Sequence, residues 1–284
     1  EEAGTGFANI ADMMIGHLLA ASRRDMETRH GPIEQGRVAV IAMGKLGGRE
    51  MTASSDLDLI LIYDHPQDVS QSSGNRPLSA GQYFQRLTQR FVAALTVPTA
   101  EGPLYEVDMR LRPSGSKGPV AASFPSFKAY HAESAWTWEK LAMTRARVVA
   151  GDTSLVAELE EAIKGFLSAR RDEAATRKDV VDMRSLMLRE HLPKTVWDIK
   201  RMRGGLVELE FIAQFLQLLH AHDHPGVLRT NTVAAYEALQ AASVLTAADA
   251  FQLVEASRLF HRLTQVLRLC LDHTFEPDKA LPGL

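Results

Sequence analysis

The sequence predicts an α+β protein in two parts: a mixed strand-and-helix domain over residues 1–150 and an all-helical bundle domain over residues 151–284. Short apolar runs ended by Gly or Pro occur in the first part, where they alternate with helical patterns. From Asp152 onward the apolar residues recur at helical spacing. The chain has 284 residues, about twice the usual size of one domain, which also favours two parts.

The first part is expected to run helix, strand, glycine-rich loop, strand, helix and strand. Residues 38–43 are six apolar residues stopped by Gly44, which is typical of a buried strand. Two further helices are expected near Phe124 and Trp136, the second closing at Gly151. The expected bounds are 7–28 and 79–95 for the helices, 38–43, 56–63 and 104–112 for the strands, and 44–48 for the loop.

Helices fill the second part. Asp152 is a favourable N-cap for the first of them, which carries Leu155 and Leu159 on one face. Because this part offers long amphipathic surfaces of mixed charge, we expect a platform for a protein partner that supplies no essential acid. Glu208 and Glu210 are expected on the exposed or domain-facing side of their helix. The remaining helices are expected over 173–191, 205–221, 233–243 and 247–272.

Composition excludes several classes of protein. The net charge is −3 and no basic run is interleaved with aromatic residues, which speaks against a nucleic-acid-binding module or a polymerase. The sequence contains no run of about 18 apolar residues, so it predicts no membrane span. The single cysteine, Cys270, suits a reducing cytoplasm and is expected to be buried and inert. The start of the chain has neither Met nor a signal peptide, so we expect part of a longer cytoplasmic protein.

Three carboxylates are the main candidates for chemistry. Asp56 and Asp58 alternate along one strand, so their side chains point to the same face while the leucines between them point into the core. The third expected strand places Asp108, Arg110 and Arg112 on one face by the same rule. If the two strands are neighbours, three carboxylates converge, and their mutual repulsion favours either raised pKa values or bound cations. Oxygen-only ligands suit Mg²⁺, and two such ions would serve an in-line displacement at phosphorus.

A glycine-rich loop precedes the Asp pair. Gly44, Gly47 and Gly48 would let backbone N–H groups approach a triphosphate, to which Lys45 adds a positive charge. A lone Asp-x-Asp or a lone glycine turn is a weak signal, but the two together on strands are much stronger. The residues we assign to nucleotide binding are the loop residues Gly44, Lys45, Gly47 and Gly48, then Ser55 before the Asp pair, and Arg110, Arg112 and Lys117, which would neutralise the leaving pyrophosphate.

This arrangement resembles the polymerase-β-type nucleotidyltransferase superfamily, whose members carry a glycine-containing loop followed by an Asp-x-Asp pair. The usual second loop residue there is Ser or Gly, and here it is Lys45. The longer stretch Gly-Lys-Leu-Gly-Gly-Arg-Glu, followed by Ser-Ser-Asp-Leu-Asp-Leu-Ile, is similar to the bifunctional glutamine synthetase adenylyltransferases, in which this lysine is normal. The similarity continues through residues 107–113, 138–139, 145–152 and 203–211.

The resemblance implies a fold, a reaction and partners. It implies a polymerase-β-type nucleotidyltransferase domain followed by a helical bundle, and Mg²⁺-dependent transfer of AMP from ATP to a tyrosine hydroxyl of glutamine synthetase. Asp56 and Asp58 would hold two Mg²⁺ ions, and Asp108 would complete the site and could act as general base. Glutamine synthetase is the implied protein substrate, and the PII signalling protein is a further candidate partner.

Two alternatives stay open. Family proteins hold one unit that attaches AMP and one that removes it by phosphorolysis to give ADP, and both share these acids. The stretches 114–119 and 135–139 look more like the adenylylating unit. The second alternative is a catalytically silent regulatory binding domain on the same fold.

Several other residues have two interpretations. We favour packing over adenine stacking for Trp136 and Trp138, and helix-end positions over a metal site for the histidines of residues 220–224. A phosphate contact and an ordinary ion pair are equally open for Arg145 and Arg147. An anion site and a simple turn are equally open for Arg201, Arg203 and the Gly204-Gly205 pair.

Overall fold

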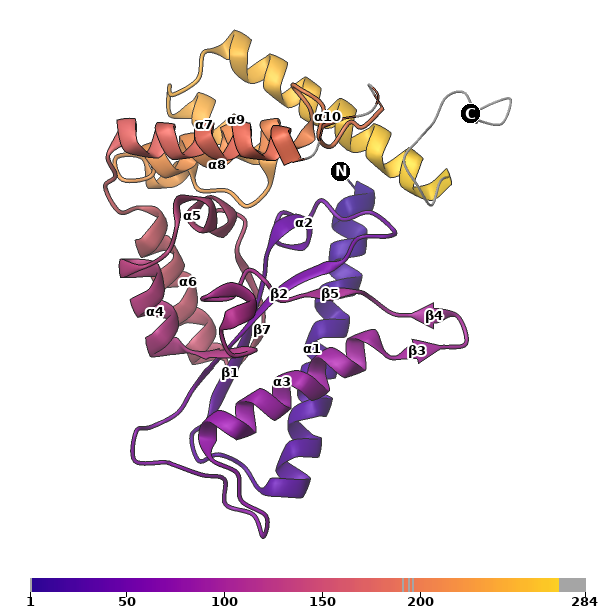
Figure 1. The fold of residues 1–284 in the computed structure, drawn as a ribbon, viewed down its shortest axis with the longest axis vertical. Helices are drawn as coiled ribbons and strands as arrows, with labels where there is room; N and C mark the ends of the chain where they lie inside the picture. The colour runs from indigo at the N-terminus through magenta and orange to yellow at the C-terminus, as the bar shows by residue number, and fades with distance from the viewer. Residues whose placement is uncertain (1, 191, 194, 196, 271–284) are drawn as a thin grey trace.

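A sheet forms the centre of the structure, with helices on both of its faces and a group of helices at one end (Figure 1). The computed structural model describes residues 2–190, 192–193, 195 and 197–270. β1 pairs antiparallel with β2 and β7, and β2 pairs in parallel with β5 and β6. The strands are β1 (Arg37–Ala42), β2 (Leu57–Asp64), β5 (Val107–Asp108), β6 (Ala121–Ser123) and β7 (Arg147–Gly151).

Both faces of the sheet are buried, as the apolar character of β1 and β2 predicts. Leu57, Leu59 and Leu61 lie in the core beneath α1 (Glu2–His30) and α3 (Ala80–Thr96). Ile60 and Ile62, on the opposite face, lie in a second core beneath α4 (Phe124–Glu133) and α6 (Thr153–Leu167). The period-two alternation of strand side chains therefore sets which residues meet which helices. The first helix is longer at both ends than the expected 7–28.

Two predictions around the site are wrong. The glycine-rich segment is a short helix, α2 (Gly44–Gly47), because the N–H of Gly48 donates to the carbonyl of Gly44. The expected strand 104–112 shrinks to the two residues of β5, since the backbone N–H of Arg110 donates to the carboxylate of Asp108 and turns the chain. A small hairpin, β3 (Pro98–Thr99) and β4 (Gly102–Pro103), precedes it.

The prediction of a helix that closes at Gly151 is also wrong. α5 (Thr137–Met143) ends earlier, and residues 147–151 form β7, an edge strand paired with β1. Asp152 does occupy the N-cap position of α6 but makes no capping bond. Its carboxylate instead accepts from the guanidinium of Arg23 and from the N–H of Val38, which joins α1, β1 and α6.

The helical end contains α7 (Glu173–Glu190), α8 (Leu206–His220), α9 (Thr232–Ala241) and α10 (Ala247–Cys270), with a short turn of 3₁₀ helix at Pro225–Val227. Buried Tyr236 anchors their core, and its hydroxyl donates to the carbonyl of Leu209. The last residues of the helices expected over 173–191 and 247–272 lie outside the described residues. Cys270 is exposed, so its expected burial is wrong.

The helix α6 belongs with the sheet by its packing. Its apolar residues Leu155, Leu159 and Ile163 lie in the same core as the isoleucines of β2. We therefore propose a domain boundary after Leu167, later than the position near 150 that the composition predicts. Among the described residues, no helix combines the length and apolarity that crossing a membrane requires.

Packing of α6 on the sheet can be tested with Leu159→Ala. The side chain is fully buried, so its loss should lower the free energy of unfolding by about 2–5 kcal/mol, measured by chemical denaturation. Leu259→Ala on α10, where the side chain is 54% exposed, is the matched control and should cost less than about 1 kcal/mol. Equal effects of the two substitutions would contradict the packing described here.

Candidate active site

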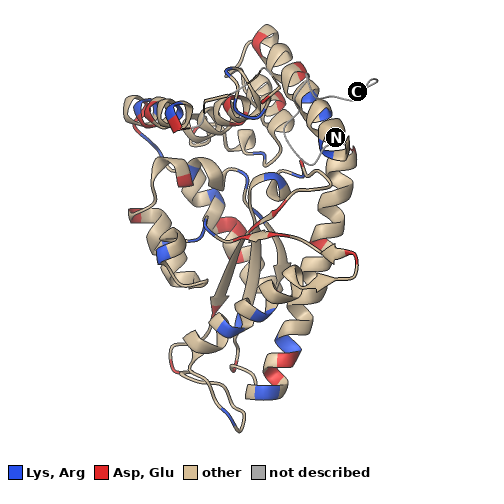
Figure 2. Ribbon diagram, turned by 45° about the vertical axis from the view of Figure 1, so that its right-hand side comes forward, with Lys and Arg blue, Asp and Glu red and all other residues tan. Residues whose placement is uncertain are grey.

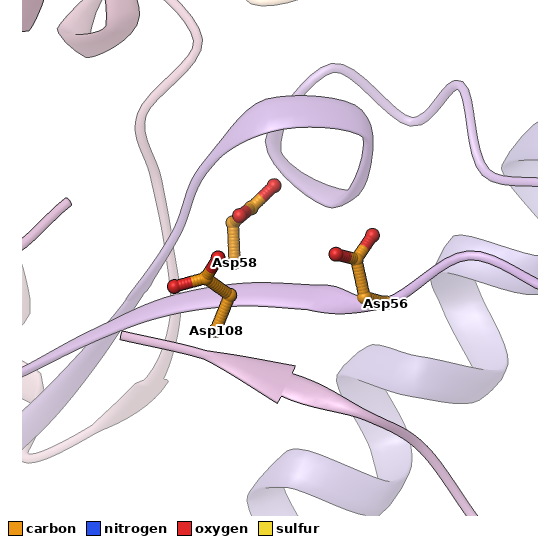
Figure 3. A group of neighbouring side chains, drawn as sticks. All are labelled: Asp56, Asp58 and Asp108. Atoms are coloured by element: carbon orange, nitrogen blue, oxygen red, sulfur yellow. The ribbon is translucent and has the colours of Figure 1, made fainter. Parts of the chain in front are cut away.

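Three carboxylates meet where β2 and β5 pair. The parallel register sets Leu57 opposite Val107 and Asp58 opposite Asp108, while Asp56 stands just before β2. One carboxylate oxygen from each of the three aspartates lies within 4.8 Å of the other two. Figure 3 shows the three side chains rising from these neighbouring segments toward one another. The expected convergence of the three acids is confirmed.

Burial and crowding oppose ionisation of the central carboxylate. Burial, followed by the charges of Asp56 and Asp108, raises the pKa of Asp58 to about 6. Neither Asp56 nor Asp58 has an ion-pair partner among the described residues. Carboxylates in this arrangement fit a divalent cation, because one bound ion would offset the repulsion and use the oxygen ligands that Mg²⁺ prefers.

Of the two arginines after β5, Arg110 lies beside Asp108 as expected, whereas the expectation is wrong for Arg112. Arg110 folds back, and its guanidinium binds the carboxylate of Asp108, which holds the pKa of Asp108 below its usual value. Arg112 is buried, and its guanidinium donates to the carbonyls of Met109 and Pro119. Arg112 therefore supports the 109–119 turn, while Arg110, with its side chain 80% exposed, stays beside the site.

Among the described residues, the side chains of Lys117 and Ser55 make no hydrogen bond or ion pair with the three carboxylates. Lys117 ends the 3₁₀ turn Gly115–Lys117, where it is exposed and has no hydrogen-bond or ion-pair partner within the described ranges. Ser55 is buried, and its hydroxyl oxygen accepts from the backbone N–H of Thr52. Ser55 thus ties the turn that leads into the Asp pair and does not point to a nucleotide.

The three glycines of the loop have different roles. Gly44 has a φ of 53°, and a Cβ there would lie 2.3 Å from a carboxylate oxygen of Asp58, so only glycine permits this approach. A Cβ at Gly47 would lie 1.8 Å from the carbonyl oxygen of Arg145, and one at Gly48 would meet the Arg145 guanidinium. The N–H groups of Gly47 and Gly48 are bonded within the turn. Gly47 and Gly48 therefore make room for Arg145, and the N–H groups of residues 44–46 precede the first intrahelical bond.

Lys45 faces a cleft of about 740 Å³ between the sheet and the helical end. Burial and the nearby charge of Lys200 lower its pKa, and no ion pair or hydrogen bond engages its ammonium group in the described part of the chain. Lys200, in the segment before α8, also lowers the pKa of Asp58 by its charge. The position of Lys200 could not be predicted from the sequence, because no sequence pattern links the segment before α8 to the strands.

Arg145 and Arg147, for which a phosphate contact and an ion pair were both possible, form ion pairs within the protein. Arg145 pairs with Glu50 and Glu210, and Arg147 pairs with Asp12. The structure thus gives both arginines ion-pair partners. The sequence does not predict a role for Glu50, because a single Glu after a glycine loop is not a recognisable motif.

Trp136 and Trp138 are 70% and 42% exposed, so packing of either side chain in the core is excluded, while packing between domains stays a prediction. Gly204 lies in the turn before α8, and its backbone N–H donates to the carboxylate of Glu208. The histidines around His220 do end α8, as expected. Over the described ranges, the aspartate triad is the single group of three or more His, Cys, Asp and Glu side chains close enough to share a metal ion.

Comparison with known proteins assigns the chain to a family. The family model described as glutamate-ammonia ligase adenylyltransferase matches residues 1–162, which is more than half of the chain. The chain belongs to this family. A second family model, described as GlnD PII-uridylyltransferase, matches residues 166–275 in the helical part.

The relatives carry one shared name, bifunctional glutamine synthetase adenylyltransferase/adenylyl-removing enzyme. The relative from Agrobacterium fabrum is 48% identical over 290 residues, covering 100% of this chain and 29% of the relative. The relative from Rhizobium meliloti is also 48% identical, with the same coverage of both chains. One from Rhodopseudomonas palustris is 45% identical, covering 99% of this chain and 28% of its own length. The chain therefore spans less than a third of the length of these relatives.

The pKa of Asp58 predicts a pH-dependent stability. A raised pKa means that protonated Asp58 stabilises the fold fully below the unfolded value of 3.8 and loses this contribution as the pH rises through about 6. Asp58→Asn, in EDTA, should therefore gain up to about 3 kcal/mol over the wild type between about pH 4 and pH 8. Mg²⁺ should raise the Tm of the wild type and not that of the variant. Identical pH profiles would refute the assignment.

Gly44 predicts a steric effect on the same carboxylate. Gly44→Ala should displace Asp58 and weaken Mg²⁺ binding by about tenfold or more, because positive φ and the collision both oppose a side chain there. Calorimetric titration with Mg²⁺ measures this. Gly81→Ala is the matched control, since a Cβ at that position of α3 meets nothing within 4 Å. Unchanged binding in Gly44→Ala would show that the glycine does not position Asp58.

Proposed function

We propose that this chain transfers AMP from ATP to a tyrosine hydroxyl of glutamine synthetase and releases pyrophosphate, as the adenylylating unit of a bifunctional enzyme. The observation that carries the proposal is the register of β2 and β5, which brings Asp58 and Asp108 side by side next to Asp56. Three such acids beneath a glycine helix, in a chain of the glutamate-ammonia ligase adenylyltransferase family, fit nucleotidyl transfer.

Each residue of the site has a separate task. Asp56 and Asp58 would hold two Mg²⁺ ions, and Asp108 would share the ion at the attacking hydroxyl. When bound, the ions supply positive charge to the attacking and leaving oxygens. Asp108 would also accept the proton of the phenol, whose ordinary pKa is about 10. The pairing with Arg110 lowers the pKa of Asp108, so this carboxylate stays ionised, as a metal ligand must be.

The positive groups around the triad suit the triphosphate. Lys45 has an ammonium group without a protein partner in the described structure, at the edge of the cleft beside α2. Arg110 has an exposed side chain that can exchange Asp108 for a phosphate oxygen. Both groups would offset charge on the leaving pyrophosphate. In Figure 2, Lys and Arg are interspersed with Asp and Glu along the coloured ribbon, so these cations act as local groups in a chain of mixed charge.

Two sequence segments favour attachment over removal of AMP. The stretch 114–119 forms an exposed turn after β5, and the stretch 135–139 carries exposed Trp136 at the start of α5. Both resemble the adenylylating unit. Exposed aromatic side chains of this kind are typical of protein-binding surfaces, which suits capture of a folded protein substrate. The PII protein remains a further candidate partner.

The reaction is tested with labelled ATP, Mg²⁺ and purified glutamine synthetase. We expect label on glutamine synthetase with the wild type, and a rate lower by about a thousandfold or more with Asp56→Asn or Asp58→Asn in variants whose circular dichroism spectrum shows the wild-type fold. Asp182→Asn is the control, because this acid is exposed on α7 and pairs with Lys178.

A parallel reaction supplies adenylylated glutamine synthetase and inorganic phosphate. Release of ADP there, without transfer from ATP, would instead identify the chain as the adenylyl-removing unit. No reaction in either assay would favour a silent binding domain.

A further inference from the structure

A buried cluster of charges joins the glycine helix α2 to the helical end. At its centre is Arg145, which is 4% exposed. Its Nε donates to the carbonyl of Gly44 at 2.9 Å, one terminal nitrogen lies 3.1 Å from Glu210, and the other is bonded to Glu50. One guanidinium thus contacts α2, the segment that follows α2, and helix α8. Its planar fork suits contact with several acceptors at once.

Glu50 continues this cluster into the next two helices. Its carboxylate accepts from the backbone N–H of Thr232 at 2.7 Å and from the side-chain amide of Asn231 at 3.1 Å, both at the start of α9. The ring of His261 on α10 lies 3.7 Å from the same carboxylate. Glu50 and Arg145 come from the sheet domain, whereas Glu210 and these three residues come from the helical end. The cluster therefore spans the two parts of the chain.

The carbonyl groups of α2 are held from both parts. Arg145 binds the carbonyl of Gly44, Arg147 binds those of Leu46 and Gly47, and Asn231 of α9 binds that of Gly48. A four-residue helix has almost no stability of its own, because it forms few internal bonds for the residues it orders. Its position therefore depends on the groups that hold its carbonyls. Gly44 in turn contacts Asp58, and Lys45 points into the cleft.

We infer that Arg145 and Glu210 are positioning residues, through which the helical end fixes α2 and so sets Lys45 and Asp58 for the nucleotide. This inference rests on the proposed function for its catalytic consequence. Glu210 of α8 completes the shell around α2, so the helical part would position α2 in addition to its expected role as a platform. A buried ion cluster adds little net stability compared with apolar packing, but it specifies one arrangement of its members.

Glu210→Gln and Glu208→Gln make a matched pair that tests this. Both residues lie on α8, but Glu208 pairs with Arg184 of α7 inside the helical end, whereas Glu210 pairs with Arg145 of the sheet domain. Hydrogen exchange of the nucleotide-free protein reports the amides of residues 47–50, which are bonded within and just after α2. We expect Glu210→Gln to speed their exchange by about tenfold and Glu208→Gln to leave it unchanged.

Activity provides the second measurement. With Glu210→Gln the KM for ATP should rise by about tenfold, while the KM for glutamine synthetase stays within about twofold of the wild type. Arg145→Lys should raise the KM for ATP at least as much, because an ammonium group cannot reach Gly44, Glu50 and Glu210 together.

Unchanged exchange at residues 47–50 in folded Glu210→Gln would overturn the inference, and so would faster exchange spread evenly over the whole chain. If the wild type transfers no AMP, the proposed function fails, yet the exchange result still decides whether Glu210 positions α2.

Discussion

The site depends on holding three negatively charged side chains closer together than they would remain by themselves. Repulsion among Asp56, Asp58 and Asp108 opposes the pairing of β2 with β5, and burial of Asp58 adds to the cost. The strands meet nevertheless, because Leu57 and Leu59 anchor β2 in the core and the N–H of Leu57 donates to the carbonyl of Glu106. Core packing thus supplies the free energy that keeps the carboxylates in position for a cation.

A second constraint follows from the first. Asp58 requires a backbone without a side chain above it, and the glycine helix α2 provides this at Gly44. Glycine-rich segments gain little from packing and are poor helix formers, so α2 must be fixed from outside. Arg145, Arg147 and Asn231 do this through the helix carbonyls, and in these bonds all three lie 101 or more residues along the chain from the carbonyl they bind. The edge of the sheet that carries the three aspartates and the helical end are therefore parts of one arrangement.

Local sequence patterns predicted the strands β1 and β2, because the burial of these strands follows from their own apolar residues. The unbroken apolar run of residues 38–43 predicted the buried strand β1, and alternation along β2 put the side chains of Asp56 and Asp58 on one face. The same reasoning failed at residues 104–112, where the Asp108 carboxylate captures the N–H of Arg110 and ends the strand after two residues. It failed again at β7, because a short apolar run preceded by a helix pattern has no feature that separates a strand from a continuing helix.

The sequence is enough to identify an Asp pair at strand spacing, a glycine run before it and a third Asp later, a pattern that resembles one family of nucleotidyltransferases. The positions of the basic side chains relative to these aspartates follow from the fold. Arg112, Gly47 and Gly48 were expected to face the nucleotide, yet Arg112 supports a turn and both glycines accommodate Arg145. Glu210 lies in the stretch 203–211 that resembles the family, but nothing in that stretch links its side chain to Arg145. The reason is physical: the spacing of residues along a strand fixes the face on which a side chain lies, whereas its partner depends on contacts between segments distant in the chain.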